Sequence, residues 1–501
     1  MSDARIILVA GALMAAGLVA SLAAGRLRVP GLVLFLGLGM AIGSDGLDWI
    51  DFSDYRLART IGVIALVLIL FEGGLNAGFG EIRPVLGPAL SLAVVGTVLT
   101  ALIAGLAATW LLDLSIRRGL LLGSIVAATD GAAIFALLRG SSLRRRLART
   151  LEGESGFNDP LAVLLVIGLI DLIRHPDYGW VDLLVLLGRE LGIGLVIGIA
   201  VGWLAIQTLR RVRLGTEAAY PIATLAAAAL AYGAAAIVHG SGFLAVYVAA
   251  LMLGSATIPA QRAVTVFHQG LAGLAQVTMF LVLGLLVFPS ELGGVAVEGT
   301  VLALVLVFAA RPLATVVATA GAGFTRPETA TLAWAGLRGA VPVVLATFPV
   351  LAGIGQSHEF FNIVFFAVLV STLIQGATFE PVARLLGVTG EGEDRPPTRP
   401  RAAPIARIST TRPWDPEDGD PSYPRAVAGV SVSNQLLTRI DEPGAVVALD
   451  DGRYAFTGPV VSVGSASALQ RAARRRLANA RSDSDRAWWR QVIGVLARGS
   501  A

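Results

Sequence analysis

The chain has 501 residues, of which 55% are hydrophobic and 15% are charged, and its mean hydropathy is +0.74. A chain this apolar is typical of a polytopic membrane protein and excludes a soluble globular protein of the same length. It contains no cysteine, which excludes disulfides, thiol catalysis and thiolate metal sites. The net charge of +4 does not indicate a nucleic-acid partner, because the arginines fall in loops and in the tail, as a membrane topology requires.

Apolar runs of about 20 residues, enough to cross a hydrocarbon core of about 30 Å, follow one another as far as Leu386. They predict an all-α polytopic membrane protein with about thirteen transmembrane helices. We place these spans near residues 5–24, 29–44, 57–77, 84–112, 117–138, 154–171, 183–209, 217–238, 240–255, 264–288, 299–321, 329–352 and 359–384.

Arginines mark one side of this topology. They gather in the odd-numbered loops, as at Arg26 and Arg28 and again over 144–149, whereas the even-numbered loops are richer in acids, as over 45–54. Cytoplasmic loops carry the excess of Lys and Arg, so we expect a plasma-membrane protein with its amino terminus outside and its carboxyl terminus in the cytoplasm. The bias is strong but incomplete, since Arg117 and Arg118 lie on the other side.

The composition changes abruptly after the last span. The sequence predicts a transmembrane domain over 1–388, a Pro-rich linker over 389–424 that cannot bury a core, and a small α+β cytoplasmic domain over 425–501. Two β-prone runs around Asp451 and Gly452 predict a hairpin. Helical patterns follow over 466–480 and 484–498, and the second of these is amphipathic.

Two consecutive apolar segments each carry an acid near the middle, Asp130 directly after Thr129 and Asp159 directly after Asn158. A charged carboxylate there costs about 2.5–3.5 kcal/mol even on the lenient insertion scale, and it usually marks an ion path or a proton relay. These four residues are therefore the leading candidate site. Pro160 follows Asp159, which predicts that a helix begins there and leaves polar backbone groups free.

Gly and Pro interrupt two spans, one at Asp130–Gly131 and the other between Trp334 and Pro342. If spans one to six and eight to thirteen are inverted repeats, the two interruptions correspond. Discontinuous helices at matching places of two halves indicate a transporter's binding site, because the unwound backbone supplies ion ligands. Gly and Pro are also common in ordinary membrane helices. The ionisable residues at both breaks favour the functional interpretation.

Four other ionisable residues lie within the spans: Glu72, Glu154, Arg311 and Arg338. Glu154 is five residues before Asp159, a spacing that does not place the two on one helical face, so we interpret it as the structural partner of an arginine. Glu72 lies near the end of its span and is either an interfacial charge or a ligand.

The available ligands suit a small hard cation. The hydroxyl groups of Thr129 and Ser155 and the carboxylates offer oxygen atoms for an alkali cation at Asp159, which could exchange it for a proton. The four histidines show no ligand spacing, and the Gly-rich strings follow no strand, so we expect no transition metal and no cofactor.

Three classes of protein place acids in a membrane. A cation channel is the main alternative to a secondary antiporter, but the chain has no repeated carbonyl-ring filter sequence. A membrane enzyme could use paired carboxylates for acid–base work. No nucleophile, histidine or metal-ligand set accompanies these carboxylates, so we do not expect an enzyme.

Five motifs occur in this order along the chain: LILFEGGLN (68–76), ATDGAAIFALL (128–138), LEGESGFNDPLAVLL (151–165), VTMFLVLGLLV (277–287) and WAGLRGAVPVVLATFPVLAG (334–353). Together they resemble the electroneutral branch of the cation:proton antiporter superfamily. Within it, the chain is similar to the potassium/proton antiporters of the cell volume regulation protein A type. The similarity extends from Met1 to Leu386.

This resemblance implies a thirteen-span fold with inverted repeats, a homodimer with a mobile core domain in each subunit, and elevator-type alternating access. It implies electroneutral exchange of K⁺ or Na⁺ for a proton across the bilayer, without deciding between the two ions. The hairpin in the tail is similar to part of a regulatory domain of potassium-transport proteins. That domain's Rossmann half is missing, so regulation by a dinucleotide is not expected.

The resemblance also assigns roles to residues. Asp159 is implied to be the carboxylate that binds the cation and the proton, with the other site residues around it: Asp130, Thr129, Ser155 and Asn158. Asn158 stands where electrogenic relatives have a second aspartate. Glu154 is implied to be the counter-ion of an arginine, first Arg311 and second Arg338. Phe157 and Gly131 depart from the family pattern, which has small polar residues and alanine at these places.

Overall fold

The computed structural model describes residues 11, 14, 15, 17, 31–131, 134, 143–212 and 214–389, and four short strands in the tail. The chain divides into two compact units, Met1–Asp394 and Arg395–Ala501.

The first unit is built from helices. The longer ones are α3 (Tyr55–Ala77), α9 (Arg145–Arg174), α10 (Trp180–Arg211), α11 (Ala219–Ile237), α13 (Gln261–Leu285) and α19 (Ser357–Leu385). The shorter ones are α2 (Gly31–Ile42), α7 (Ile116–Ala127), α12 (Gly242–Ser255), α17 (Arg326–Trp334) and α18 (Ala340–Leu351).

Two further stretches are composite, and they repeat the same succession of segments. The first comprises α4 (Phe79–Ile82), the 3₁₀ turn η1 (Arg83–Val85), α5 (Leu86–Ser91), the π-helical segment η2 (Leu92–Gly96) and α6 (Thr97–Leu111). The second comprises α14 (Pro289–Leu292), the 3₁₀ turn η3 (Gly293–Val295), α15 (Ala296–Val305), the π-helical segment η4 (Leu306–Ala310) and α16 (Arg311–Ala318). Each π-helical segment contacts the other stretch, η2 packing on α16 and η4 on α6.

Within the described residues, eight helices or composite stretches are long and apolar enough to cross a membrane, and three shorter apolar helices accompany them. The expectation of a mostly helical membrane protein is thus confirmed. Nearly all of the predicted span 5–24 lies outside the described residues, so the total of thirteen stays a prediction. The recurring composite stretches fall in spans that the proposed repeat relates, but the inverted orientation of the repeats also stays a prediction.

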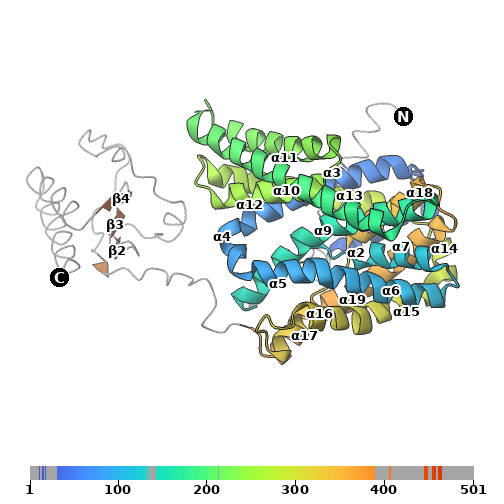
Figure 1. Ribbon diagram of the computed structural model, residues 1–501. Helices are drawn as coiled ribbons and strands as arrows, with labels where there is room; N and C mark the ends of the chain where they lie inside the picture. Colours follow the sequence, from blue (N-terminus) through green and yellow to red (C-terminus); the bar gives the residue numbers. More distant parts are fainter. Residues whose placement is uncertain are drawn as a thin grey trace, which may run out of the picture. The chain divides into compact units, whose positions relative to one another are not determined.

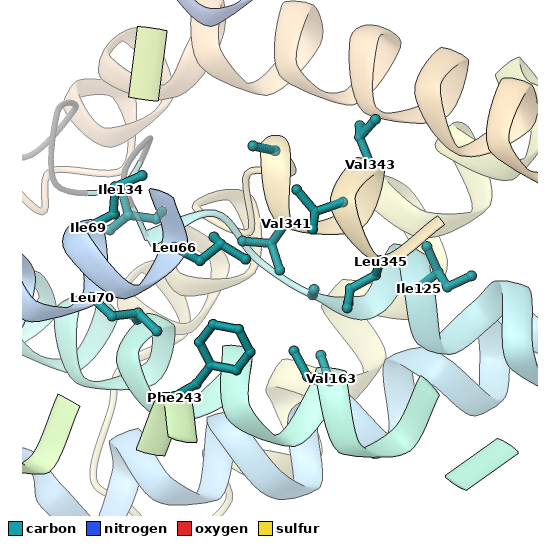
Figure 2. Close-up of a cluster of buried hydrophobic side chains, with 14 of the residues drawn as sticks. Leu66, Ile69, Leu70, Ile125, Ile134, Val163, Phe243, Val341, Val343 and Leu345 are labelled. Carbon is teal, nitrogen blue, oxygen red and sulfur yellow. The ribbon is translucent and has the colours of Figure 1, made fainter. Parts of the chain in front are cut away.

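The helices of this unit form two groups. One contains α2, α3 and α10 to α13, which pack on one another, and the other contains α5, α6, α7, α9 and α15 to α19. In Figure 1, α10, α11 and α12 lie along one side and α6, α15 and α16 along the opposite side, with α9 between them. Figure 2 shows where the groups meet in an apolar core, with Leu66 and Leu70 of α3 gathered near Val163 of α9 and Val341 of α18.

The beginning of α9 is held by the end of the transmembrane unit. Leu143 forms an isolated antiparallel bridge with Thr389, and the Arg144 backbone N–H donates to the Val388 carbonyl at 3.2 Å. The Arg144 side chain also pairs with Glu328 of α17 at 3.3 Å. These contacts fix the position of α9 relative to α17 and α19.

The second unit contains an antiparallel sheet in the order β1 (Ala406–Arg407), β2 (Ala445–Ala448), β3 (Tyr454–Thr457) and β4 (Val461–Gly464). Strands β2 and β3 pair with Val446 opposite Phe456, which confirms the hairpin predicted around Asp451 and Gly452. Strand β1 lies in the segment predicted to be a linker only, and it instead pairs with β2. The helices predicted over 466–480 and 484–498 lie outside the described residues.

Candidate cation site

The two predicted interruptions are present, and they contact each other. Helix α7 ends at Ala127, and the chain is extended at Ala128 and non-helical through Asp130. Helix α17 ends at Trp334, and α18 does not begin until Ala340. The Asp130 backbone N–H donates to the Leu337 carbonyl at 2.9 Å, so the two non-helical segments are hydrogen-bonded to each other.

Each interruption supplies a charged side chain to a helix end of the other. The Asp130 carboxylate accepts a hydrogen bond at 3.2 Å from the N–H of Ala340, the first residue of α18. Nη1 of Arg338 donates at 2.6 Å to the carbonyl of Ala127, the last residue of α7. A helix is positive at its amino end and negative at its carboxyl end. The acid and the arginine therefore stabilise both of these buried helix ends.

Close approach explains the glycine between these groups. A Cβ at Gly339 would overlap the Asp130 carboxylate, so a side chain at this position would push the acid away from the α18 amino end. Helix α19 supports the same break, because Thr372 Oγ1 donates to the Arg338 carbonyl at 2.5 Å and Gln375 Nε2 to the Trp334 carbonyl at 3.0 Å. Our reading of the sequence missed these two residues. Their signal is a pair of polar residues three apart in an apolar span.

Asp159 lies in the interior of a continuous helix. The predicted helix start at Asp159 and Pro160 is wrong, because α9 begins at Arg145 and runs unbroken to Arg174. Proline lacks an N–H, so the carbonyl of Gly156, four residues earlier, loses its usual helical donor. Packing against neighbouring helices lets a membrane helix tolerate such a proline. The polar backbone group is thus freed one turn before Asp159 instead of at a helix end.

Asp159 and Asn158 offer buried oxygen atoms. The Asp159 side chain is 3% exposed, and its Oδ1 has no hydrogen-bond partner among the described residues. Asn158 Nδ2 donates to Thr129 Oγ1 at 3.0 Å, which ties α9 to the first break, while Asn158 Oδ1 is likewise without a partner in the described part of the chain. Buried polar atoms are nearly always satisfied. Buried carboxylate and amide oxygens that lack a hydrogen-bond partner are suitable ligands for an alkali cation.

Ser155 and Glu72 lie less directly at the site. Ser155 is buried one turn before Asp159 on α9, and its hydroxyl donates to the Leu151 carbonyl at 3.0 Å, which leaves its oxygen able to accept or to ligate. Glu72 is buried in α3, and it accepts a hydrogen bond from Asn76 Nδ2 at 2.5 Å. Whether Glu72 acts as an interfacial charge or as a ligand stays a prediction.

Glu154 forms a buried ion pair with Arg311. The two guanidinium nitrogens Nη1 and Nη2 of Arg311 lie 2.5 and 2.8 Å from the two carboxylate oxygens, and both side chains are 2% exposed. Arg311 also donates to the Leu332 carbonyl at 3.2 Å, and a Cβ at Gly336 would overlap its side chain. Arg311 thus joins α16, α9 and the second break, whereas Arg338 is occupied with the end of α7.

Replacing Asp130 by asparagine is expected to impair the site without unfolding the protein. Asparagine keeps the acceptor for the Ala340 N–H but removes the charge from the α18 amino end. Such a charge is worth up to about 2 kcal/mol at a partly buried helix end, so ion exchange in proteoliposomes is expected to fall about tenfold or more. Asp177→Asn, an exposed loop change, is the control. An unchanged rate and cation affinity in Asp130→Asn would show that the charge has no part in transport.

The chain is similar in sequence to a family of known proteins and to individual members of it. Residues 11–385 match the family model described as sodium/hydrogen exchanger, transmembrane. The chain is 41% identical over 393 residues to the K(+)/H(+) antiporter NhaP of Alkalimonas amylolytica, which covers 78% of this chain and 68% of that protein. It is 39% identical over 382 residues to the K(+)/H(+) antiporter NhaP2 of Shewanella sp. (strain ANA-3), covering 75% and 66%. The chain spans about two thirds of the length of these relatives.

A solved structure shows the same fold. The sodium proton antiporter MjNhaP1 from Methanocaldococcus jannaschii at pH 8 matches with a TM-score of 0.67 and 26% sequence identity, over 76% of this chain and 99% of that chain. The family predicted from the five motifs is confirmed, because the family model matches more than half of the chain. The protein is a multi-pass membrane protein that belongs to the sodium/hydrogen exchanger family.

Proposed function

We propose that the protein is a secondary antiporter that exchanges a monovalent cation, K⁺ or Na⁺, for a proton, and that Asp159 binds either of them. The observation that carries this proposal is the Asp159 carboxylate itself. It is buried beside two interrupted helices, and its Oδ1 has no protein donor among the described residues. A carboxylate in such a place needs a proton or a cation to offset its desolvation.

The other charges near the two breaks are already compensated. Glu154 pairs with Arg311, and Asp130 and Arg338 each stabilise a helix end. Among the described residues at the breaks, three carboxylates thus face two guanidinium groups, and Asp159 is the acid in excess. One proton or one monovalent cation restores the balance. Asn158 cannot titrate, so the adjacent pair contributes a single exchangeable charge.

This balance supports electroneutral exchange, one cation for one proton. The two relatives described above are named as K⁺/H⁺ antiporters and the solved structure as a sodium proton antiporter, so both ions are candidates here. Membership of an antiporter family favours exchange over a channel. We also propose a homodimer in the plasma membrane, with the amino terminus outside, the carboxyl terminus in the cytoplasm, and elevator-type movement of the group that carries α7, α9 and α18.

The test is exchange in proteoliposomes that contain a pH dye inside. Addition of K⁺ or Na⁺ to the outside is expected to move protons out, at a rate and to an equilibrium gradient that an imposed membrane potential leaves unchanged. A gradient that shifts with the potential would mean that net charge moves and that the one-carboxylate mechanism is wrong. Cation flux without any proton movement would favour a channel.

A further inference from the structure

Tyr247 of α12 is fully buried against α9, one turn before the candidate site. Its hydroxyl donates to the Glu152 carbonyl at 3.4 Å, and its ring meets Phe157 edge-on, with the ring centroids 5.1 Å apart. The ring lies so close over Gly156 that a Cβ there would overlap three of its atoms. Position 156 must therefore be glycine for the Tyr247 ring to occupy this place.

The residues under the ring form one stripe of α9. Glu152, Gly156 and Asp159 are spaced by four and three residues, which places them on the same helical face. Solvent exposure falls along this stripe. Glu152, which pairs with Arg149 one turn earlier, has a side chain that is 14% exposed, and that of Arg149 is 26% exposed. Asp159 is 3% exposed. The Tyr247 ring covers the point where exposure is lost.

The ring is seated beside a backbone group that lacks its helical partner, because Pro160 deprives the Gly156 carbonyl of its usual donor. The Tyr247 hydroxyl donates to the Glu152 carbonyl and its ring lies over Gly156, so Tyr247 contacts α9 on the amino-terminal side of Asp159. The ring thus lies between the partly exposed beginning of α9 and the buried carboxylate.

The contact joins the two helix groups of the transmembrane unit. Helix α12 packs chiefly on α3, α10 and α11, whereas α9 packs on α5, α7 and α10, with fewer contacts to α12. A ring seated over a glycine holds two helices in one register, because either helix can slide only after the ring has left its seat. Alternating exposure of Asp159 would require this contact to open.

We propose that Tyr247 is the residue that closes the route from the amino-terminal end of α9 to Asp159, with Gly156 as its seat and Phe157 as its lateral support. The proposal deepens the antiport function proposed above and rests on it for its role in transport. The closure itself is a property of the packing, so it is tested separately from ion exchange.

The absence of cysteine from the chain allows a direct accessibility test. A single cysteine at Ser155, a buried position next to the ring's seat, is labelled with a membrane-impermeant, positively charged methanethiosulfonate reagent. The labelling rate of Ser155→Cys alone is compared with that of Ser155→Cys combined with Tyr247→Ala or with Tyr247→Phe. Tyr247→Ala is expected to raise the rate about tenfold or more, the effect of about 1.4 kcal/mol on local opening. Tyr247→Phe, which keeps the ring, is expected to leave the rate unchanged.

The chain offers a matched control. Tyr232 of α11 lies over Gly242 of α12, where a Cβ would overlap its ring, and it meets Phe243 edge-on with centroids 5.3 Å apart. This is the same arrangement of a tyrosine over a Gly-Phe pair, but it lies within one helix group. Tyr232→Ala combined with Ser155→Cys is expected to label as slowly as Ser155→Cys alone.

The increase is expected in inside-out vesicles, which expose the predicted cytoplasmic side, and not in right-side-out vesicles. No increase with Tyr247→Ala, an equal increase with Tyr232→Ala, or an increase confined to right-side-out vesicles would overturn the proposal. If Tyr247→Ala does not yield a monodisperse protein, Tyr247→Leu replaces it, with the same expected increase. A parent protein that exchanges no cation for protons would contradict the proposed function, while the labelling result would still decide whether Tyr247 closes the route.

Discussion

Replacement of Asp159 by asparagine is expected to reduce cation-dependent proton exchange to the level of vesicles without protein. Asparagine keeps the volume of the side chain, but it can neither bind a proton nor supply the negative charge that holds an alkali cation. The fold is expected to be retained, because the buried Asp159 carboxylate is costly to desolvate and its Oδ1 has no hydrogen-bond partner among the described residues. The measurement is dye-reported proton flux in proteoliposomes after addition of K⁺ or Na⁺, together with thermal unfolding of the purified protein in detergent.

The matched control is Asp171→Asn, near the end of the same helix, where the side chain is only half-buried. This variant is expected to exchange ions at the parent rate, which separates the loss of Asp159 from a general effect of removing charge from α9. Cation-dependent flux above background in Asp159→Asn would rule out this carboxylate as the exchangeable one. A melting temperature well below that of the parent would assign it a structural role instead.

Arg311→Ala is expected to have the largest effect on stability. The substitution leaves Glu154 buried without its bidentate partner and removes the bond to the Leu332 carbonyl. Breaking one side of a buried ion pair costs about 3–5 kcal/mol, because the remaining charge is not compensated. The measurement is the thermal unfolding transition, followed by tryptophan fluorescence, which is expected to move to a clearly lower temperature.

Two comparisons make this result specific. The double variant Glu154→Gln with Arg311→Met removes both charges and is expected to recover most of the lost stability, since replacing a whole buried pair is often close to neutral. Arg384→Ala breaks the exposed pair with Glu380, whose side chains are 68% and 51% exposed, and is expected to cost about 0–1 kcal/mol. If Arg311→Ala melts like Arg384→Ala, the buried pair does not hold α9 to α16.

The membrane fold was largely predictable, because the bilayer sets the length of each apolar run. The interruption after Ala127 and the one before Ala340 were predictable for a related reason, since glycine and an ionisable residue coincide at each, with a proline following the second. The helix start at Pro160 was predicted wrongly. There the local signal of a proline was outweighed by the packing of α9, and no local pattern reports how well neighbouring helices support a helix.

The site was predictable in its acids but not in its pairings. Asp159 and Asp130 stand out because a charge in an apolar span is costly. The choice of Arg311 over Arg338 for Glu154 depends on a contact between residues 157 positions apart, which the sequence alone could not resolve. Tyr247 was missed altogether. An aromatic residue in an apolar helix has no distinctive pattern, and its meaning lies in the glycine of another helix that it covers.

The excess of one acid among the charges at the two breaks has a thermodynamic consequence for the leakage of ions. If Asp159 is the exchangeable carboxylate, the vacant protein carries one more buried negative charge than the loaded one. Removing an ion from water costs several kcal/mol in a protein interior, and every 1.4 kcal/mol slows a crossing about tenfold. Under the proposed mechanism, the vacant site would therefore be carried across the membrane far more slowly than a site that holds a proton or a cation. The free-energy cost of dehydrating a single carboxylate would thus prevent the vacant site from returning across the membrane. Neither ion gradient would then be dissipated without the other.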